Sequence, residues 1–104
     1  MIPTQNGFEL VRAKEIIRLQ ADSNYTIFFL ADKRQLLVSR TLKEFDEMLS
    51  GHEFFRVHHS HLINLTYVKN YAKGEGGVVT MEDGTAIDVA RRKKDDFIKA
   101  LESV

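Results

Sequence analysis

The chain has 104 residues, of which 43% are hydrophobic and 29% charged, and this predicts one folded domain over residues 1–104 rather than a disordered chain. Fifteen basic and fifteen acidic residues give a formal net charge of zero, so net charge alone does not favour a nucleic-acid partner. The lack of cysteine excludes a disulfide scaffold, a thiolate metal site and a cysteine nucleophile. Because no apolar run approaches the ~20 residues of a membrane span, we expect a cytoplasmic protein without a membrane partner.

The first half of the chain is predicted to hold short strands and one helix. Strand-like patterns occur at 8–11 and 16–19, and β-formers at 25–30 and 35–39 flank a turn-like segment, which predicts a hairpin. Thr41 and Glu44 have the spacing of a capping box, so a helix is expected over 41–50, with Gly51 as its left-handed stop. Its predicted apolar stripe consists of Leu42, Phe45 and Leu49, with Met48 beside them.

The second half is also predicted to be rich in strands. One strand is expected within 62–71, and segments 79–82 and 85–89 flank Asp83-Gly84, a dipeptide suited to a type I′ hairpin turn. The tail at 92–101 predicts a terminal helix with Phe97, Ile98 and Leu101 facing inward. Strands at close spacing around one well-marked helix predict a mainly antiparallel β fold.

Charges are segregated along the chain although they balance overall. No acid occurs from 33 to 43 or from 54 to 74, and the second stretch holds three of the four histidines. A basic run follows at 91–94. Such segregation permits a positive face on a neutral protein, although charge runs more often form an ordinary solvated surface.

Segment 54–64 is the part of the chain richest in polar side chains of the kinds used in catalysis, metal binding and nucleic-acid contact. A metal site would use His58 or His59 with His61, but neighbouring residues on a strand point to opposite faces and no carboxylate completes the set. A hydrolase using Ser60 would need a glycine-flanked elbow, and the glycines at 74–77 do not form a phosphate-binding pattern. We therefore expect no enzyme, no metal and no cofactor.

Two other interpretations of this segment stay open. Histidine, serine and asparagine hydrogen-bond base edges and phosphates, and Arg91 or Arg92 offers the fork that guanine accepts. Alternatively, His58 or His61 is a core histidine satisfied by backbone groups and Arg56 pairs with Glu53. A β-rich protein-interaction module that does not bind DNA is the competing function.

Four motifs resemble those of the LytTR family, a bacterial DNA-binding domain, in the family's order over about residues 14–101. Segment 22–26 resembles its "x-N-Y-T" loop, and 39–49 resembles its helix with an "S-L-K-E-L" opening. Segment 54–64 is similar to the signature "F-x-R-x-H-R-S-x-x-V-N", and 81–92 resembles "L-x-D-G-x-x-I-P-V-S-R-R". The chain departs from these patterns at His59, where the family commonly has Arg or Lys, and at Ala90, where it commonly has Ser.

The resemblance implies an elongated, mainly β fold of about ten strands in three antiparallel sheets, with one short helix and a C-terminal helix. It implies sequence-specific binding of double-stranded promoter DNA by loops in successive major grooves, with the DNA bent around them. The expected context is the output domain of a two-component response regulator, controlled by a receiver domain and sensor kinase and dimeric on repeated sites. The implied DNA-facing residues are Asn24, Tyr25, His59, Ser60, Arg91 and Arg92, with Lys93, Lys69 and Arg40 contacting phosphates.

Overall fold

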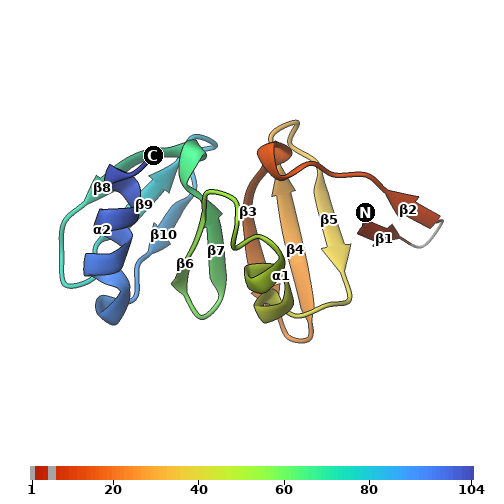
Figure 1. Ribbon diagram of the computed structural model, residues 1–104, viewed down its shortest axis with the longest axis horizontal. Coiled ribbons are helices and arrows are strands. Elements are labelled where there is room, and N and C mark those ends of the chain that lie inside the picture. The colour runs from red at the N-terminus through yellow and green to blue at the C-terminus, as the bar shows by residue number, and fades with distance from the viewer. Residues whose placement is uncertain (1, 5–6) are drawn as a thin grey trace.

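The structure is a computed structural model that describes residues 2–4 and 7–104, and its strands form three antiparallel sheets (Figure 1). The sheet orders are β5-β4-β3-β7-β6, β10-β9-β8 and β1-β2. The strands are β1 (Ile2–Thr4), β2 (Gly7–Glu9), β3 (Ile16–Asp22), β4 (Tyr25–Leu30), β5 (Gln35–Val38), β6 (Phe54–His58), β7 (His61–Asn64), β8 (Val68–Ala72), β9 (Val78–Met81) and β10 (Ala86–Asp88). The helices are α1 (Leu42–Met48) and α2 (Lys94–Glu102), with 3-10 turns η1 (Ala13–Glu15), η2 (Leu65–Tyr67) and η3 (Arg91–Lys93). The mainly β architecture is confirmed. Within the described residues, no helix has the length and apolarity needed to cross a membrane.

Helix α1 begins where its cap predicted but ends earlier than expected. The carboxylate of Glu44 accepts a hydrogen bond of 3.0 Å from the backbone N–H of Thr41, as the capping spacing predicted. The helix ends at Met48, whose side chain is 57% exposed rather than packed on the sheet. Gly51 does not adopt a positive φ, so the predicted left-handed stop is wrong; Leu49 ends the helix with φ −98°.

The single strand expected within 62–71 is in fact two strands in different sheets. β7 ends at Asn64, and η2 separates it from β8, which pairs with β9. The side chain of Asn64 accepts a hydrogen bond of 3.1 Å from the N–H of Thr66 and donates one of 2.9 Å to the carbonyl of Ile16. This buried amide therefore stabilises the change of direction that the apolar pattern concealed.

The β9–β10 hairpin is confirmed, but its turn differs from the predicted type I′. The N–H of Gly84 donates to the carbonyl of Met81 at 2.9 Å, and Met81 in turn donates to Thr85 at 2.9 Å. Gly84 has φ +90°, whereas Asp83 does not have a positive φ. The loop is therefore a type I turn followed by a left-handed glycine, because a type I′ turn would need a positive φ at both central residues. Ile87 and Val89 are buried as predicted.

Two hydrophobic cores lie side by side along an elongated body of 43 × 24 × 24 Å. The first packs α1 on the five-stranded sheet, where the rings of Phe28 and Phe45 meet edge to face at 4.7 Å. The second packs α2 on the three-stranded sheet around the fully buried Phe97, with Leu101 packed against it as predicted, whereas Ile98 is not part of this core. Leu62 joins the first core and its neighbour Ile63 joins the second. β7 therefore contributes to both cores, since successive side chains of a strand face opposite ways.

Candidate nucleic-acid interface

Three connections of the fold lie along one long margin of the molecule, the lower one in Figure 1. We name this surface the loop margin. It comprises the β3–β4 turn with its two flanking residues at 22–25, the residues before α1 at 39–41, the β6–β7 turn at 59–60 and the segment from the end of β10 to α2 at 88–93. The strand registers require this placement. Gln20 pairs with His61 and Asp22 with Tyr25, so the β3–β4 and β6–β7 turns lie at the same end of the five-stranded sheet.

Three hydrogen bonds fix these connections relative to one another. The hydroxyl of Thr26 donates to the carbonyl of Arg40 at 2.7 Å, which joins the α1 segment to the β3–β4 hairpin. The N–H of Ala21 donates to the carbonyl of Ser60 at 2.9 Å, which joins the β6–β7 turn to β3. The N–H of Ala90 donates to the carbonyl of Val57 at 2.7 Å, which links the two larger sheets just before Arg91. These three hydrogen bonds hold the loops as one preorganised surface.

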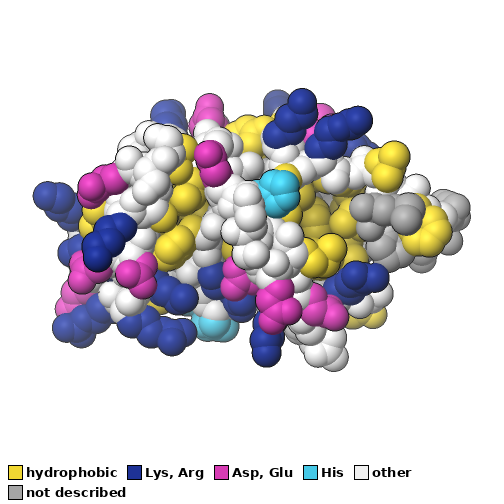
Figure 2. Space-filling model, in the orientation of Figure 1, with side chains coloured by type: hydrophobic (Ala, Val, Ile, Leu, Met, Phe, Trp, Pro, Cys, Tyr) yellow, Lys and Arg dark blue, Asp and Glu magenta, His cyan; other side chains and the backbone are white. Residues whose placement is uncertain are grey.

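The loop margin carries most of the predicted contact residues with their side chains accessible. Ser60 and Lys93 are half-buried, and the exposed members are Asn24, Tyr25, Arg40, His59, Arg91 and Arg92. Within the described part of the chain, the three arginines make no ion pair with an acid. Figure 2 shows Lys and Arg side chains gathered beneath α2 and a histidine at the same margin, with acids clustered by α1. The accessible cations are thus available to an external anion.

Arg56 has a structural role that the sequence did not reveal. Its guanidinium donates to the carbonyls of His58 at 3.1 Å and of His59, and it lies 3.7 Å from Asp46 on α1. The alternative in which Arg56 pairs with Glu53 is therefore wrong. Arg56 holds the β6–β7 turn in shape from within, because its fork reaches two carbonyls that a hairpin turn leaves free. The only sequence signal was its position in the signature segment.

The histidines of the signature segment form a close group. The rings of His58 and His59 lie 4.2 Å apart and those of His58 and His61 5.7 Å apart. The expectation that His58 and His59 face opposite sides is wrong, because β6 ends at His58 and His59 lies in the turn. The Nδ1 of His58 accepts the N–H of Ser60 at 3.2 Å, in agreement with the backbone-satisfied alternative. Among the described residues, no group of three or more possible ligands is placed to hold a metal ion.

His61 differs from its neighbours because its environment disfavours a charge. Its Nδ1 is buried without a hydrogen-bond partner in the described structure, so the alternative of a histidine satisfied by backbone groups does not hold for this atom. Burial lowers the pKa of His61, and the positive charge of Arg18 lowers it further. The environment of His61 therefore favours the neutral form of its imidazole.

Lys69 is the one predicted contact residue that the structure separates from the others. It lies near the start of β8, next to Val68. Val68 pairs with Met81, beside the β9–β10 turn. The loop margin lies at the other end of this sheet, where Ala72 and Asp88 both pair with Val78. Antiparallel pairing therefore places Lys69 about one strand length away from Arg91.

Comparison with known proteins gives consistent matches. Residues 6–102 match the family described as LytTr DNA-binding domain. The chain is 31% identical over 87 residues to the heme-containing CO-sensing transcriptional regulator RcoM 2 of Paraburkholderia xenovorans, covering 81% of this chain and 32% of that protein. It is 30% identical over 92 residues to RcoM 1 of the same organism, covering 86% of this chain and 34% of that protein. The chain thus spans about a third of the length of these relatives.

A solved structure confirms the fold. The LytTr DNA-binding domain of a putative methyl-accepting/DNA response regulator from Bacillus cereus superimposes with a TM-score of 0.81. It shares 22% sequence identity and covers 96% of this chain and 93% of its own. The family is defined by DNA binding rather than by catalysis, and the curated relatives are transcriptional regulators. This chain belongs to the LytTr DNA-binding domain family of bacterial transcriptional regulators.

Proposed function

We propose that this domain reads a specific sequence in double-stranded promoter DNA with the side chains of the loop margin. The observation that carries the proposal is the joining of three loops by hydrogen bonds into one margin, at which Arg40, Arg91 and Arg92 form no ion pair with an acid of the described residues. The family favours DNA over the alternative of a protein-interaction module.

The dimensions of the domain suit binding along a duplex. Its longest extent is 43 Å, whereas successive major grooves on one side of B-DNA are about 34 Å apart. The β3–β4 turn and the β10–α2 segment lie toward opposite ends of the margin (Figure 1). We propose that these two loops enter successive major grooves, with the β6–β7 turn between them.

The side chains divide into base readers and phosphate contacts. The planar fork of Arg92 fits guanine O6 and N7, and the exposed ring of His59 takes a place commonly held by a longer cation in the family. Arg40 and Lys93 contact phosphates. Asn24 and Tyr25 at the first turn, together with Ser60 and Arg91, complete the contact set.

Acidic side chains limit the affinity of a single domain. Asp22 at the first turn and Asp88 before Arg91 are both exposed at the loop margin, and the formal net charge is zero. Two domains on a repeated site offset this weakness, because the second binding event becomes intramolecular. We therefore propose binding as a dimer, within a longer regulator whose receiver domain responds to a sensor kinase.

Selection from random duplexes tests this function. Bound sequences are enriched at two salt concentrations with the domain fused to a dimerising coiled coil, and affinity is then measured by fluorescence anisotropy. We expect a short repeated motif, and the Arg92→Ala variant should lose ~1–3 kcal/mol of binding free energy and relax one base position.

Arg12→Ala is the matched control. It removes the same charge from an exposed arginine at the opposite margin, beside η1. Its motif and affinity should equal those of the unmodified domain. Failure of the forced dimer to enrich any motif would contradict sequence-specific recognition, and equal losses in both variants would remove the base-reading role of Arg92.

A further inference from the structure

A cavity of about 500 Å³ lies between the two larger sheets, away from the loop margin. Ile17, Leu30 and Ala31 form much of one wall, at the end of β3 and β4 where Ile16 pairs with Leu30. Glu82, Asp83 and Thr85 of the β9–β10 turn line the other. The volume lies within the range of small-molecule sites, and junctions between packed units are common places for them.

A buried cation forms part of this cavity. Arg18 is 7% exposed, and its guanidinium carbon stacks 3.6 Å from the centre of the Phe29 ring. Its Nη1 donates to Gln20 at 2.9 Å, whereas its Nε is buried without a partner in the described structure. No carboxylate of the described chain lies within ion-pair distance of Arg18. Buried arginines are normally paired closely. Burial lowers the pKa of Arg18, and its charge is opposed only at longer range by Asp83, which raises that pKa against the effect of burial.

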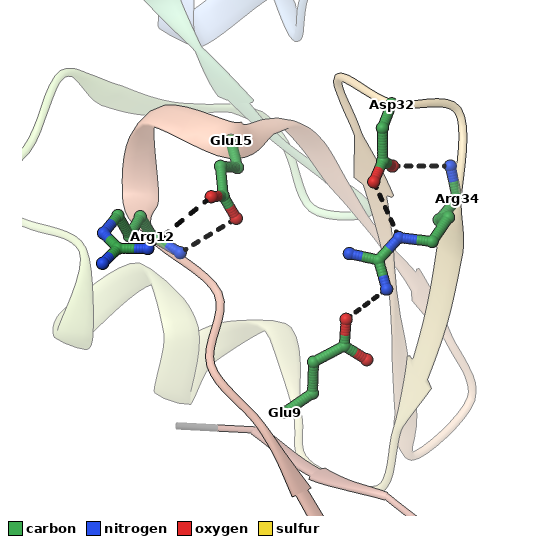
Figure 3. A network of polar contacts seen from close by, with 5 residues as sticks. All are labelled: Glu9, Arg12, Glu15, Asp32 and Arg34. Atoms are coloured by element: carbon green, nitrogen blue, oxygen red, sulfur yellow. Dashed lines mark hydrogen bonds and ion pairs between the residues drawn. The ribbon is translucent and has the colours of Figure 1, made fainter.

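Two further cations stand at the rim, and only one is available. Arg34 is held by Asp32 at 2.7 Å and by Glu9 (Figure 3). Lys33 has no ion pair within the described structure and adopts φ +74°, a left-handed conformation that costs a lysine energy. Strained backbone of this kind tends to cluster at ligand sites. Lys33 thus offers a second charge to the cavity that Arg18 lines.

The opposite wall selects the charge of the occupant. Glu82 and Asp83 are acids, and only one oxygen of Asp83 is engaged, accepting the N–H of Thr85 at 2.9 Å. These acids repel a dianion more strongly than a monoanion, which can pair with Arg18 and Lys33 on the other side. The apolar side chains and the ring of Tyr67 offer contact to a flat hydrocarbon body.

We propose that this cavity is a binding site for a small aromatic carboxylate, whose carboxylate pairs with Arg18 and Lys33 and whose ring packs on the apolar wall. The proposal does not depend on DNA recognition, because the cavity and the loop margin lie at opposite ends of β3 and β4.

Titration of the ¹⁵N-labelled domain with benzoate, followed by amide NMR shifts, tests the proposal. We expect saturable shifts in the millimolar range at Ile17, Leu30, Lys33 and Thr85. Benzamide has the same shape without the charge and should bind at least about tenfold more weakly, since charged hydrogen bonds supply the difference. Inorganic phosphate should leave these amides unshifted.

Two variants locate the site. Lys33→Gly removes the rim charge while fitting φ +74°, so it should fold normally and weaken benzoate binding about threefold. Ser23→Gly is its control, because Ser23 also has a positive φ, +57°, but lies in the β3–β4 turn away from the cavity. The affinity of the Ser23→Gly variant for benzoate should be unchanged. Arg18→Met should abolish saturable shifts.

Several results would overturn the assignment. Shifts at Arg92 and His59 in place of the cavity amides would show that benzoate binds the loop margin. Equal binding of benzamide or phosphate would remove the aromatic carboxylate as the ligand class, as would the absence of shifts at tens of millimolar benzoate. Should Arg18→Met fail to fold, equal affinity of Lys33→Gly and Ser23→Gly for benzoate would decide against the site.

Discussion

Gly76 approaches Val89 so closely that a Cβ on Gly76 would lie 1.9 Å from the carbonyl oxygen of Val89. The same Cβ would lie 3.1 Å from the N–H nitrogen of Arg91. The β8–β9 loop therefore packs directly on the end of β10. A glycine that belongs to no phosphate-binding pattern thus supports the backbone that carries the arginines of the loop margin.

The Gly76→Ala variant should consequently lose stability. Overpacking against a backbone carbonyl costs about 1–3 kcal/mol, because the whole segment must shift. Urea unfolding of both proteins measures the loss. Gly74→Ala is the matched control, since its nearest contacts would be at an ordinary 3.6 Å. Identical urea midpoints for Gly76→Ala and Gly74→Ala would contradict the close packing.

Substitution of Arg56 by Gln should loosen the β6–β7 turn. Two turn carbonyls lose a charged donor, so the free energy of unfolding should fall by about 1–3 kcal/mol and DNA affinity should fall with it. Asp46→Asn removes only the partly exposed ion pair and should cost at most about 1 kcal/mol. Chemical denaturation and fluorescence anisotropy give the two quantities. A larger stability loss for Asp46→Asn than for Arg56→Gln would reverse the assigned roles.

The Lys93→Ala variant should weaken binding to all DNA sequences alike. Loss of one phosphate contact lowers the slope of log affinity against log salt by about 0.9, without changing base preference. Lys69→Ala removes the same charge at the other end of the three-stranded sheet and should leave the slope unchanged. Anisotropy titrations at several salt concentrations compare the two. A changed base preference in Lys93→Ala would show that Lys93 reads bases.

The stability of the domain should fall as the solution becomes mildly acidic, partly through His61. Burial lowers the pKa of His61 in the folded state, so the unfolded chain binds a proton more readily below the usual pKa near ~6.5. Stability then rises with pH wherever the unfolded state binds more protons. The contribution of His61 is therefore complete above about pH 6.5 and declines as pH falls toward the lowered pKa of the folded state.

Replacing His61 by Gln isolates this contribution. Urea unfolding at a series of pH values should show a smaller loss of stability on acidification in His61→Gln than in the unmodified domain. His52→Gln, at an exposed position between α1 and β6, should retain the original pH dependence. The same pH dependence in all three proteins would mean that His61 does not contribute.

The sequence by itself determined the local structure and the kinds of side chain that line the loops. The capping residues Thr41 and Glu44 placed the start of α1, alternation at Ile87 and Val89 predicted the buried face of β10, and the motif at 54–64 identified the family. These features depend on neighbours within a few residues. Their physical causes, capping and side-chain alternation, are therefore readable from the chain, whereas the turn conformations predicted at Gly51 and at Asp83-Gly84 were wrong.

Contacts between distant segments were decided only by the tertiary structure. The apolar run at 62–71 gave no sign that Asn64 would hydrogen-bond Ile16 and divide it into two strands of different sheets. Likewise, strand pairing within the three-stranded sheet determined that Lys69 lies far from Arg91. The approach of the β9–β10 turn to β3 and β4 determined that Arg18 lines a cavity. Such outcomes depend on which strands become neighbours, and that choice is made by burying two cores at once on the opposite faces of β7.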